Sequence, residues 1–123
     1  MFKQIILVGI GGGIGSILRF IISLISDKFF SVKIPIPTLI VNVLGSFLIG
    51  LILAYLQKNN AESSDLKYLL AIGFCGGFTT FSAFAWENLQ FLNSQNYNLA
   101  FLYIVLSLVL CFLGVAGGYF LVK

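Results

Sequence analysis

Charged and titratable side chains are scarce in this sequence. Only 9% of its 123 residues are Asp, Glu, Lys or Arg, and histidine is absent. No carboxylate lies near the middle of a long apolar stretch, which argues against a proton relay across a membrane. Nothing pairs a nucleophile with a base, forms a phosphate-binding loop or clusters metal ligands. These absences predict that the chain is not an enzyme.

Cysteine and proline are also rare. The two cysteines, Cys75 and Cys111, fall inside apolar stretches and lack CxxC spacing, so neither a metal site nor a structural disulfide is predicted. We expect both thiols to pack inside the protein. The two prolines, Pro35 and Pro37, suit the entry and first turn of a helix that follows them.

Apolar residues, by contrast, make up 59% of the chain, and the mean hydropathy is +1.06. A soluble globule of this size could not solvate such a surface. Four charge-poor stretches each approach or exceed the ~20 residues that a spanning helix needs. They cover about residues 4–26, 35–57, 68–92 and 98–122. The sequence therefore predicts an all-α integral membrane protein, with residues 1–123 forming a single transmembrane domain.

The positive charges bear on partners and on orientation. A net charge of +3 does not predict nucleic-acid binding here, because the lysines lie beside helix ends and meet lipid headgroups instead. Four spans divide the lysines into Lys3, Lys58, Lys67 and Lys123 on one side of the membrane and Lys28 and Lys33 on the other. Counting Arg19 makes four against three, a bias too weak to fix one orientation. Insertion both ways and an antiparallel dimer are therefore allowed; a single orientation is the alternative.

The third stretch contains a segment that suits a continuous helix poorly. Residues Gly73 to Ser82 read GFCGGFTTFS. Glycine costs roughly 1 kcal/mol per position against alanine, and threonine is stiff at χ1. Unwound backbone at membrane depth must line protein or a watery cavity, so broken spans tend to mark ion or substrate sites. Because the hydroxyls of Thr79, Thr80 and Ser82 can bond freed backbone groups or a ligand, we predict a broken third helix with a functional site.

A few other polar or small residues lie within the spans. We expect Arg19 to snorkel to the interface, with a position facing a cavity as the alternative. Asn42 is predicted to tie helices together, and Glu87 to be a solvated or headgroup-level carboxylate. Glycines at GxxxG spacing recur in three of the spans and predict close helix contacts.

Three segments resemble the Fluc (CrcB) family of fluoride channels. They read GGGIGSILRF from Gly11 to Phe20, PTLIVNVLGSFLIG from Pro37 to Gly50 and GFCGGFTTFSAF from Gly73 to Phe84. The resemblance covers all four spans, and the GGxTTFSxF string is highly specific. It implies antiparallel, dual-topology homodimers in the bacterial inner membrane, which pass fluoride out of the cell down its gradient.

The resemblance also implies roles for individual residues. Phe81 and Phe84 match paired rings that line the fluoride route. Asn42 matches a pore asparagine that donates to fluoride, and Arg19 matches a vestibule arginine whose charge raises the local anion concentration.

A polar track and a metal site complete what the resemblance implies. The track comprises Thr80, Ser82, Tyr103 and Ser107. Cys111 departs from the expected serine, and a thiol is a weaker donor. The backbone carbonyls of Gly76 and Thr79 from each subunit would hold a structural sodium ion.

Two other functions fit a small four-span protein. A dual-topology multidrug exporter would exchange protons through a membrane-central glutamate in its first helix, but residues 4–26 contain no glutamate. A non-transporting assembly subunit would explain the glycines, yet it would leave Phe81, Phe84 and Asn42 without a joint purpose.

Overall fold

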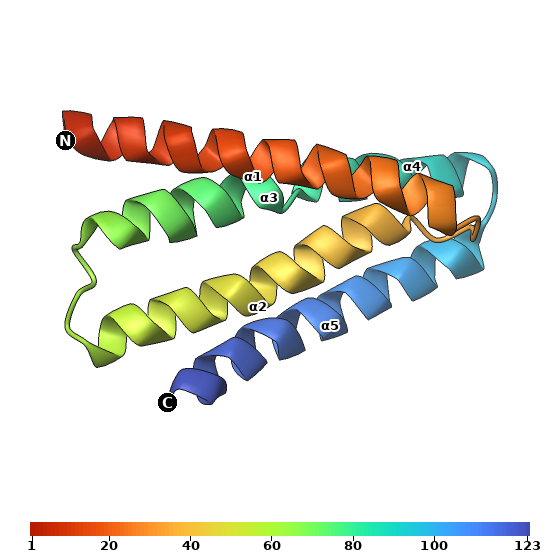
Figure 1. Ribbon diagram of the computed structural model, residues 1–123. Coiled ribbons are helices and arrows are strands. Elements are labelled where there is room, and N and C mark those ends of the chain that lie inside the picture. Colours follow the sequence, from red (N-terminus) through yellow and green to blue (C-terminus); the bar gives the residue numbers. More distant parts are fainter.

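The computed structural model describes all 123 residues as helices joined by short loops, without strands. Three spans are single helices: α1 (Phe2–Phe29), α2 (Ile36–Lys58) and α5 (Tyr97–Val122). The remaining span has three parts: a π-helix η1 (Lys67–Cys75), α3 (Gly76–Phe78) and α4 (Phe81–Asn93). All four are long and apolar enough to cross a membrane, which confirms the predicted fold class (Figure 1).

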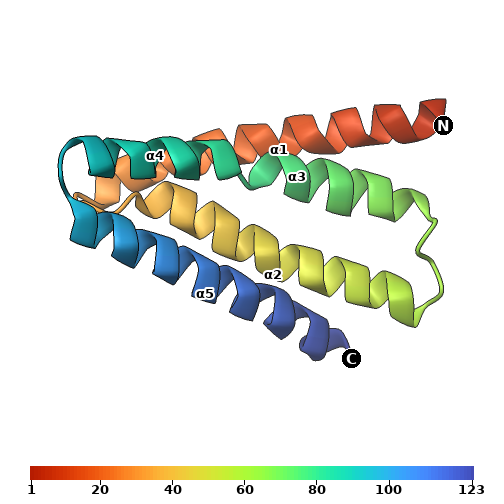
Figure 2. The ribbon, with the colours of Figure 1, turned by 180° about the vertical axis from the view of Figure 1, so that it is seen from behind.

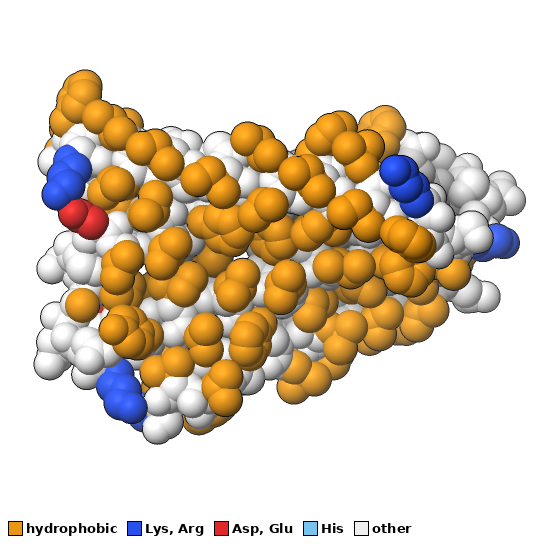
Figure 3. Space-filling view, in the orientation of Figure 1, with side chains coloured by type: hydrophobic (Ala, Val, Ile, Leu, Met, Phe, Trp, Pro, Cys, Tyr) orange, Lys and Arg blue, Asp and Glu red, His pale blue; other side chains and the backbone are white.

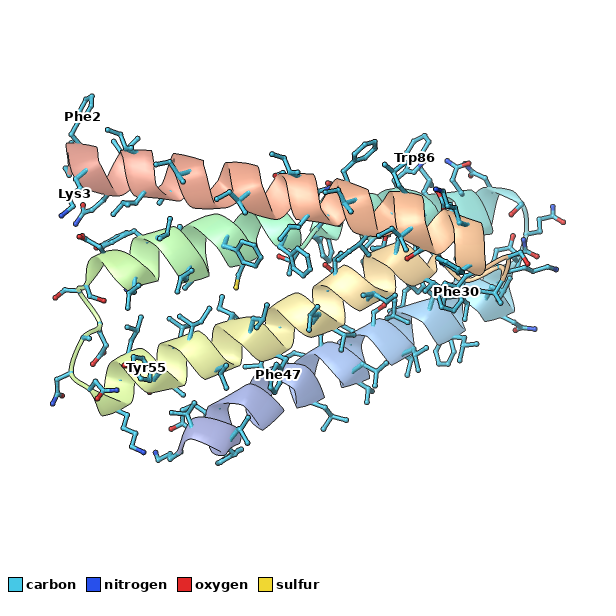
Figure 4. All side chains as sticks on the ribbon, viewed as in Figure 1. Phe2, Lys3, Phe30, Phe47, Tyr55 and Trp86 are labelled. Carbon is cyan, nitrogen blue, oxygen red and sulfur yellow. The ribbon has the colours of Figure 1, made fainter.

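The outer surface is that of a membrane protein. Only 18 of 123 residues are buried, and apolar side chains such as Phe112 and Leu121 are 74% and 70% exposed. Figure 3 shows a broad apolar belt, with charged side chains toward the two ends of this face. Trp86 points away from the bundle near the end that holds Phe30, whereas Tyr55 lies near the opposite end (Figure 4). Such a belt is suited to lipid, so the chain is a multi-pass membrane protein.

Both chain termini and the connection from α2 to η1 lie at one end of the bundle (Figure 1). There, Lys3 Nζ and Asp65 Oδ2 are 2.7 Å apart, and Lys58 Nζ donates to Val122 O at 3.3 Å. The connections from α1 to α2 and from α4 to α5 lie at the other end. This arrangement groups the lysines as the four-span topology requires.

Glycines bring α1 against η1 and α3 with main-chain contact. A Cβ on Gly15 would overlap Phe74 O and lie 2.8 Å from Phe78 N, and one on Gly77 would overlap the backbone of Gly12. Only glycine permits this approach, because a Cβ essentially never lies so close to another heavy atom. The close helix contacts predicted from glycine spacing are confirmed for this pair.

The second tight pair joins α2 and α5, which lie side by side in both views (Figures 1 and 2). A Cβ on Gly118 would overlap Phe47 O and lie 2.7 Å from Leu51 N, and one on Gly50 would overlap Val115 O. Phe47 lies between the two helices (Figure 4). The bundle therefore consists of two glycine-packed pairs. The interrupted span belongs to the first pair, and it also contacts α2 and α5 of the second pair.

The glycines of the third span do not cause its interruption. Gly73 belongs to η1, while Gly76 and Gly77 form α3, and no glycine in the chain has a positive φ. The interruption falls at Thr79 and Thr80 instead. A helical glycine costs only about 1 kcal/mol, which close packing against α1 offsets. The predicted broken helix is confirmed, but the expected role of its glycines is wrong.

Candidate functional site

The interruption is a two-residue extended segment between α3 and α4. Thr79 has φ −87° and ψ 160°, and Thr80 has φ −151° and ψ 122°. Thr79 donates its N–H and its Oγ1 hydroxyl to Cys75 O, at 3.0 and 2.8 Å. Thr80 Oγ1 accepts from Ala83 N at 3.2 Å and so caps α4. The two hydroxyls replace part of the bonding that the interruption removes, as was predicted.

One side chain from α2 binds both main-chain groups of Thr80. Asn42 Nδ2 donates to Thr80 O at 3.0 Å, and Thr80 N donates to Asn42 Oδ1 at 2.8 Å. The prediction that Asn42 ties helices together is confirmed. The second Nδ2 hydrogen has no acceptor within the chain, so the amide keeps one free donor.

These contacts release two carbonyl oxygens from helical bonding. In a continuous helix Gly76 O would accept from Thr80 N, which instead donates to Asn42. Thr79 O would accept from Ala83 N, which instead donates to Thr80 Oγ1. No other donor reaches either oxygen. They are the two carbonyls that the family resemblance assigns to sodium, and free carbonyls are suitable ligands for a hard cation.

A third carbonyl of the interruption is occupied by side chains of α1. Gly77 O accepts from Arg19 Nε at 3.0 Å and from Ser16 Oγ at 3.5 Å. Arg19 is half-buried and lines a cavity of about 220 Å³ whose walls include Thr38 and Glu87. The snorkelling prediction is wrong, and the cavity-facing alternative holds. The carbonyl end of the helix formed by η1 and α3 favours a cation inside the span.

A second cavity, of about 390 Å³, lies beside the interruption. Its walls include these predicted site residues: Asn42, Gly76, Thr79, Thr80, Phe81, Phe84 and Ser107. The hydroxyl of Ser107 is buried and has no hydrogen-bond partner, which is unusual for a buried polar atom. Cys75 and Cys111 line the same cavity. A free hydroxyl and the free amide hydrogen of Asn42 thus belong to residues of one cavity wall.

Aromatic rings continue from this cavity into the protein. The centroids of Phe81 and Phe84 are 5.6 Å apart, and those of Phe84 and Tyr103 are 5.0 Å apart. Phe81 is 77% exposed, Phe84 is half-buried and Tyr103 is fully buried. Tyr103 therefore lies behind the cavity, not on its wall. Ser82 also lies off the wall, with its Oγ 3.2 Å from Thr80 Oγ1.

Glu87 is held inside the protein by two hydroxyls. Its Oε2 accepts from Thr38 Oγ1 at 2.6 Å, and its Oε1 accepts from Tyr103 OH at 2.8 Å. Thr38 and Tyr103 are both buried. The prediction of a freely solvated carboxylate is wrong, because a protein hydroxyl donates to each oxygen of this half-buried side chain.

Sequence reasoning missed Thr38 and the hydrogen bonds of Glu87, although helical spacing contains a signal for both residues. Thr38 lies four residues before Asn42, and Glu87 lies three residues after Phe84. Residues three or four apart share a helix face, so each lies on the same face as a predicted site residue. Considering the positions one helical turn before and after each predicted site residue would have identified both Thr38 and Glu87.

The fold and the site together define a class. This is a four-span helical membrane protein with a discontinuous helix, whose unwound backbone lines a cavity with both apolar and polar walls. Membrane transport proteins use discontinuous helices of this kind to hold ions and substrates at membrane depth.

Comparison with known proteins gives the family. The model of the family described as "CrcB-like protein, Camphor Resistance (CrcB)" matches residues 6–119. A "Fluoride-specific ion channel FluC" of Flavobacterium psychrophilum is 44% identical over 121 residues, 98% of both chains. Proteins of the same name from Azobacteroides pseudotrichonymphae and Campylobacter jejuni are 43% and 44% identical over 123 residues, covering 100% of this chain and 98% and 100% of theirs. The chain belongs to the CrcB family. The relatives' names agree with the prediction that it is not an enzyme.

Proposed function

We propose that this chain forms a passive, fluoride-selective channel in the bacterial inner membrane, through which cytoplasmic fluoride leaves the cell. Fluoride enters as neutral HF and dissociates at cytoplasmic pH, so an outward anion leak lowers fluoride toxicity without an energy source. Relatives named as fluoride-specific channels match nearly the whole chain. The observation that carries the proposal is the cavity at the interrupted helix, whose wall includes Ser107, a residue with a buried hydroxyl that has no partner.

The residues around this cavity supply contacts that can replace the water around a small anion. Desolvating an unpaired ion costs on the order of tens of kcal/mol in the Born limit, so successive donors are needed. Ser107 and Asn42 each have a free donor, and the ring edges of Phe81 and Phe84 carry positive quadrupole character. Arg19 adds a positive charge near the route. A narrow path of such donors favours fluoride over the larger chloride.

We further propose that two copies assemble as an antiparallel homodimer. Phe81 belongs to the proposed route, yet it is 77% exposed in the single chain, so a second copy is needed to cover it. With Arg19 counted, the positive charges divide four against three between the two ends, which permits insertion in both orientations. A two-fold axis would then pair the two interruptions.

In that dimer, a structural sodium ion would be held by Gly76 O and Thr79 O of each copy. Both oxygens lack donors within the chain, and hard oxygen ligands without carboxylates suit a monovalent cation. When bound, the ion would link the two interrupted spans. Replacing sodium with N-methyl-D-glucamine should lower the melting temperature of the purified dimer. An unchanged melting temperature and unchanged dimer fraction would exclude this role.

Flux from liposomes tests the channel itself. Purified protein in potassium fluoride liposomes should release fluoride when valinomycin lets potassium follow, with no proton gradient, as measured by a fluoride electrode. Matched potassium chloride liposomes should release little chloride. A requirement for a proton gradient would indicate the exporter instead, and absence of release would indicate a non-transporting subunit. Equal chloride release would overturn the selectivity.

A further inference from the structure

The ends of α2 and α5 enclose a basic notch. A cavity of about 220 Å³ is lined by Ala54, Gln57, Lys58, Tyr119 and Lys123. Lys58 is the last residue of α2, and Lys123 directly follows α5. Since both helices span the membrane, the notch lies at the level of lipid headgroups. It is separate from the two cavities at the interrupted helix.

Both ammonium groups of the notch are held in place by neighbouring groups. Lys58 Nζ donates to Val122 O at 3.3 Å, and Lys123 Nζ donates to Tyr119 OH at 2.8 Å while lying 5.1 Å from the centre of that ring. Each of these two hydrogen bonds uses one N–H of an ammonium group, so each lysine keeps two N–H groups that are free to donate. Tyr119 accepts from Lys123, so its own O–H is free to donate, as is the amide of Gln57.

No aspartate or glutamate side chain pairs with these two lysines. The only ion pair of the structure joins Lys3 and Asp65. At the opposite end of the bundle, a cavity of about 180 Å³ contains Lys33 together with Asp27, one charge of each sign. Of these two cavities at the membrane surface, only the notch at Lys58 and Lys123 is lined by basic residues without an acidic side chain.

We propose that this notch binds the phosphate group of an anionic phospholipid. Basic pockets between transmembrane helices at the membrane surface suit such headgroups, and the notch adds hydroxyl and amide donors to two charges. Phe120 and Leu121, in the last turn of α5, are each 70% exposed and can contact the acyl chains. A lipid phosphate is favoured over free phosphate because these apolar side chains border the donors.

Native mass spectrometry of the purified protein tests the proposal without reference to fluoride. The probes are phosphatidylglycerol and phosphatidylcholine, compared in the wild type, the K58Q/K123Q variant and a K28Q/K33Q control. Each lysine near a lipid surface contributes about fivefold in affinity, so the first variant should bind phosphatidylglycerol ~30-fold more weakly. The control and a charge-preserving K58R/K123R variant should bind nearly as the wild type does.

Three outcomes would overturn the proposal. Equal loss in K58Q/K123Q and K28Q/K33Q would reduce the effect to general charge attraction. If the wild type retained zwitterionic phosphatidylcholine and anionic phosphatidylglycerol equally, the notch would not select lipids by the negative charge of the headgroup. The third outcome is that the wild type retains no lipid, while inorganic phosphate raises its melting temperature but not that of K58Q/K123Q. The notch would then bind a free anion. The K58R/K123R variant controls for misfolding in all three cases. Its arginines keep the positive charges and can donate to Val122 O and Tyr119 OH as the lysines do.

Discussion

Asn42 and Thr80 exchange two hydrogen bonds, from Nδ2 to Thr80 O at 3.0 Å and from Thr80 N to Oδ1 at 2.8 Å. The amide of one side chain thus bonds to Thr80 as a neighbouring strand would. Because Thr80 N is committed to Asn42, it cannot donate to Gly76 O. A single contact from α2 therefore both stabilises the interruption and frees a carbonyl beside the cavity.

Replacing Asn42 with Asp should destabilise the interruption and reduce fluoride flux. A carboxylate can still accept from Thr80 N, but it has no hydrogen to donate to Thr80 O and repels it. We expect about 2 kcal/mol lower stability in a detergent unfolding titration and a fall in liposome flux of about tenfold or more. Ser46→Ala is the control, because Ser46 lines the same cavity without a hydrogen bond. Full flux in Asn42→Asp would remove Asn42 from the route.

Phe81→Ile should separate permeation from stability. Phe81 is 77% exposed in the chain, so shortening it removes little internal packing, yet it takes an aromatic edge from the proposed route. Fluoride flux should fall about tenfold or more, while crosslinking still detects the dimer. The matched control is Phe112→Ile on α5, where the ring is 74% exposed, and it should conduct normally. Similar flux in both variants would contradict a role for Phe81.

Gly15→Ala should disrupt the contact between α1 and the third span. The added Cβ would overlap Phe74 O and lie 2.8 Å from Phe78 N, and neither main-chain atom can move alone. The expected loss is about 1–3 kcal/mol or more, as for other overpacked sites. Gly13→Ala, two residues away, meets no heavy atom within 4 Å and should be neutral or slightly stabilising. Equal unfolding midpoints would refute the glycine-packed interface.

Glu87 and Tyr103 should be energetically coupled. A double-mutant cycle of Glu87→Ala and Tyr103→Phe removes the 2.8 Å hydrogen bond from both directions. We expect a coupling free energy of about 1 kcal/mol in unfolding titrations, within the range for hydrogen bonds between membrane helices. The same cycle with Phe101→Leu in place of Tyr103→Phe is the control, since Phe101 is 71% exposed. Additive effects in the first cycle would show that the bond contributes nothing to stability.

The sequence was most informative about features that depend on one helix alone and not on its neighbours. Length and hydropathy were sufficient for the four spans, because a bilayer fixes both. The interruption was predicted for the correct segment, and it falls at the two threonines of that segment. The position of the break within that segment was not predicted, because the glycines from Gly73 to Gly77 remain helical against α1. That outcome depends on a neighbouring helix, which local propensity does not describe.

Charged residues inside the spans were the least predictable. Arg19 and Glu87 lie at depths from which long side chains can reach either water or the protein. Their partners, Gly77 O and the hydroxyls of Thr38 and Tyr103, come from other spans, and sequence spacing within one helix does not reveal them. Asn42 was easier, because an uncharged amide in a span has few uses other than joining helices.

The contacts of Thr79 and Thr80 also bear on biogenesis. Cys75 O, the Thr80 hydroxyl and the Asn42 amide bond the N–H groups of the interruption and Thr80 O from within one polypeptide, while Gly76 O and Thr79 O are left without a donor. A newly inserted copy can therefore hold its kinked span in lipid before it meets another. Dimerisation would then join two preformed halves, so the speed of assembly should depend on lateral encounter and not on refolding of the kink.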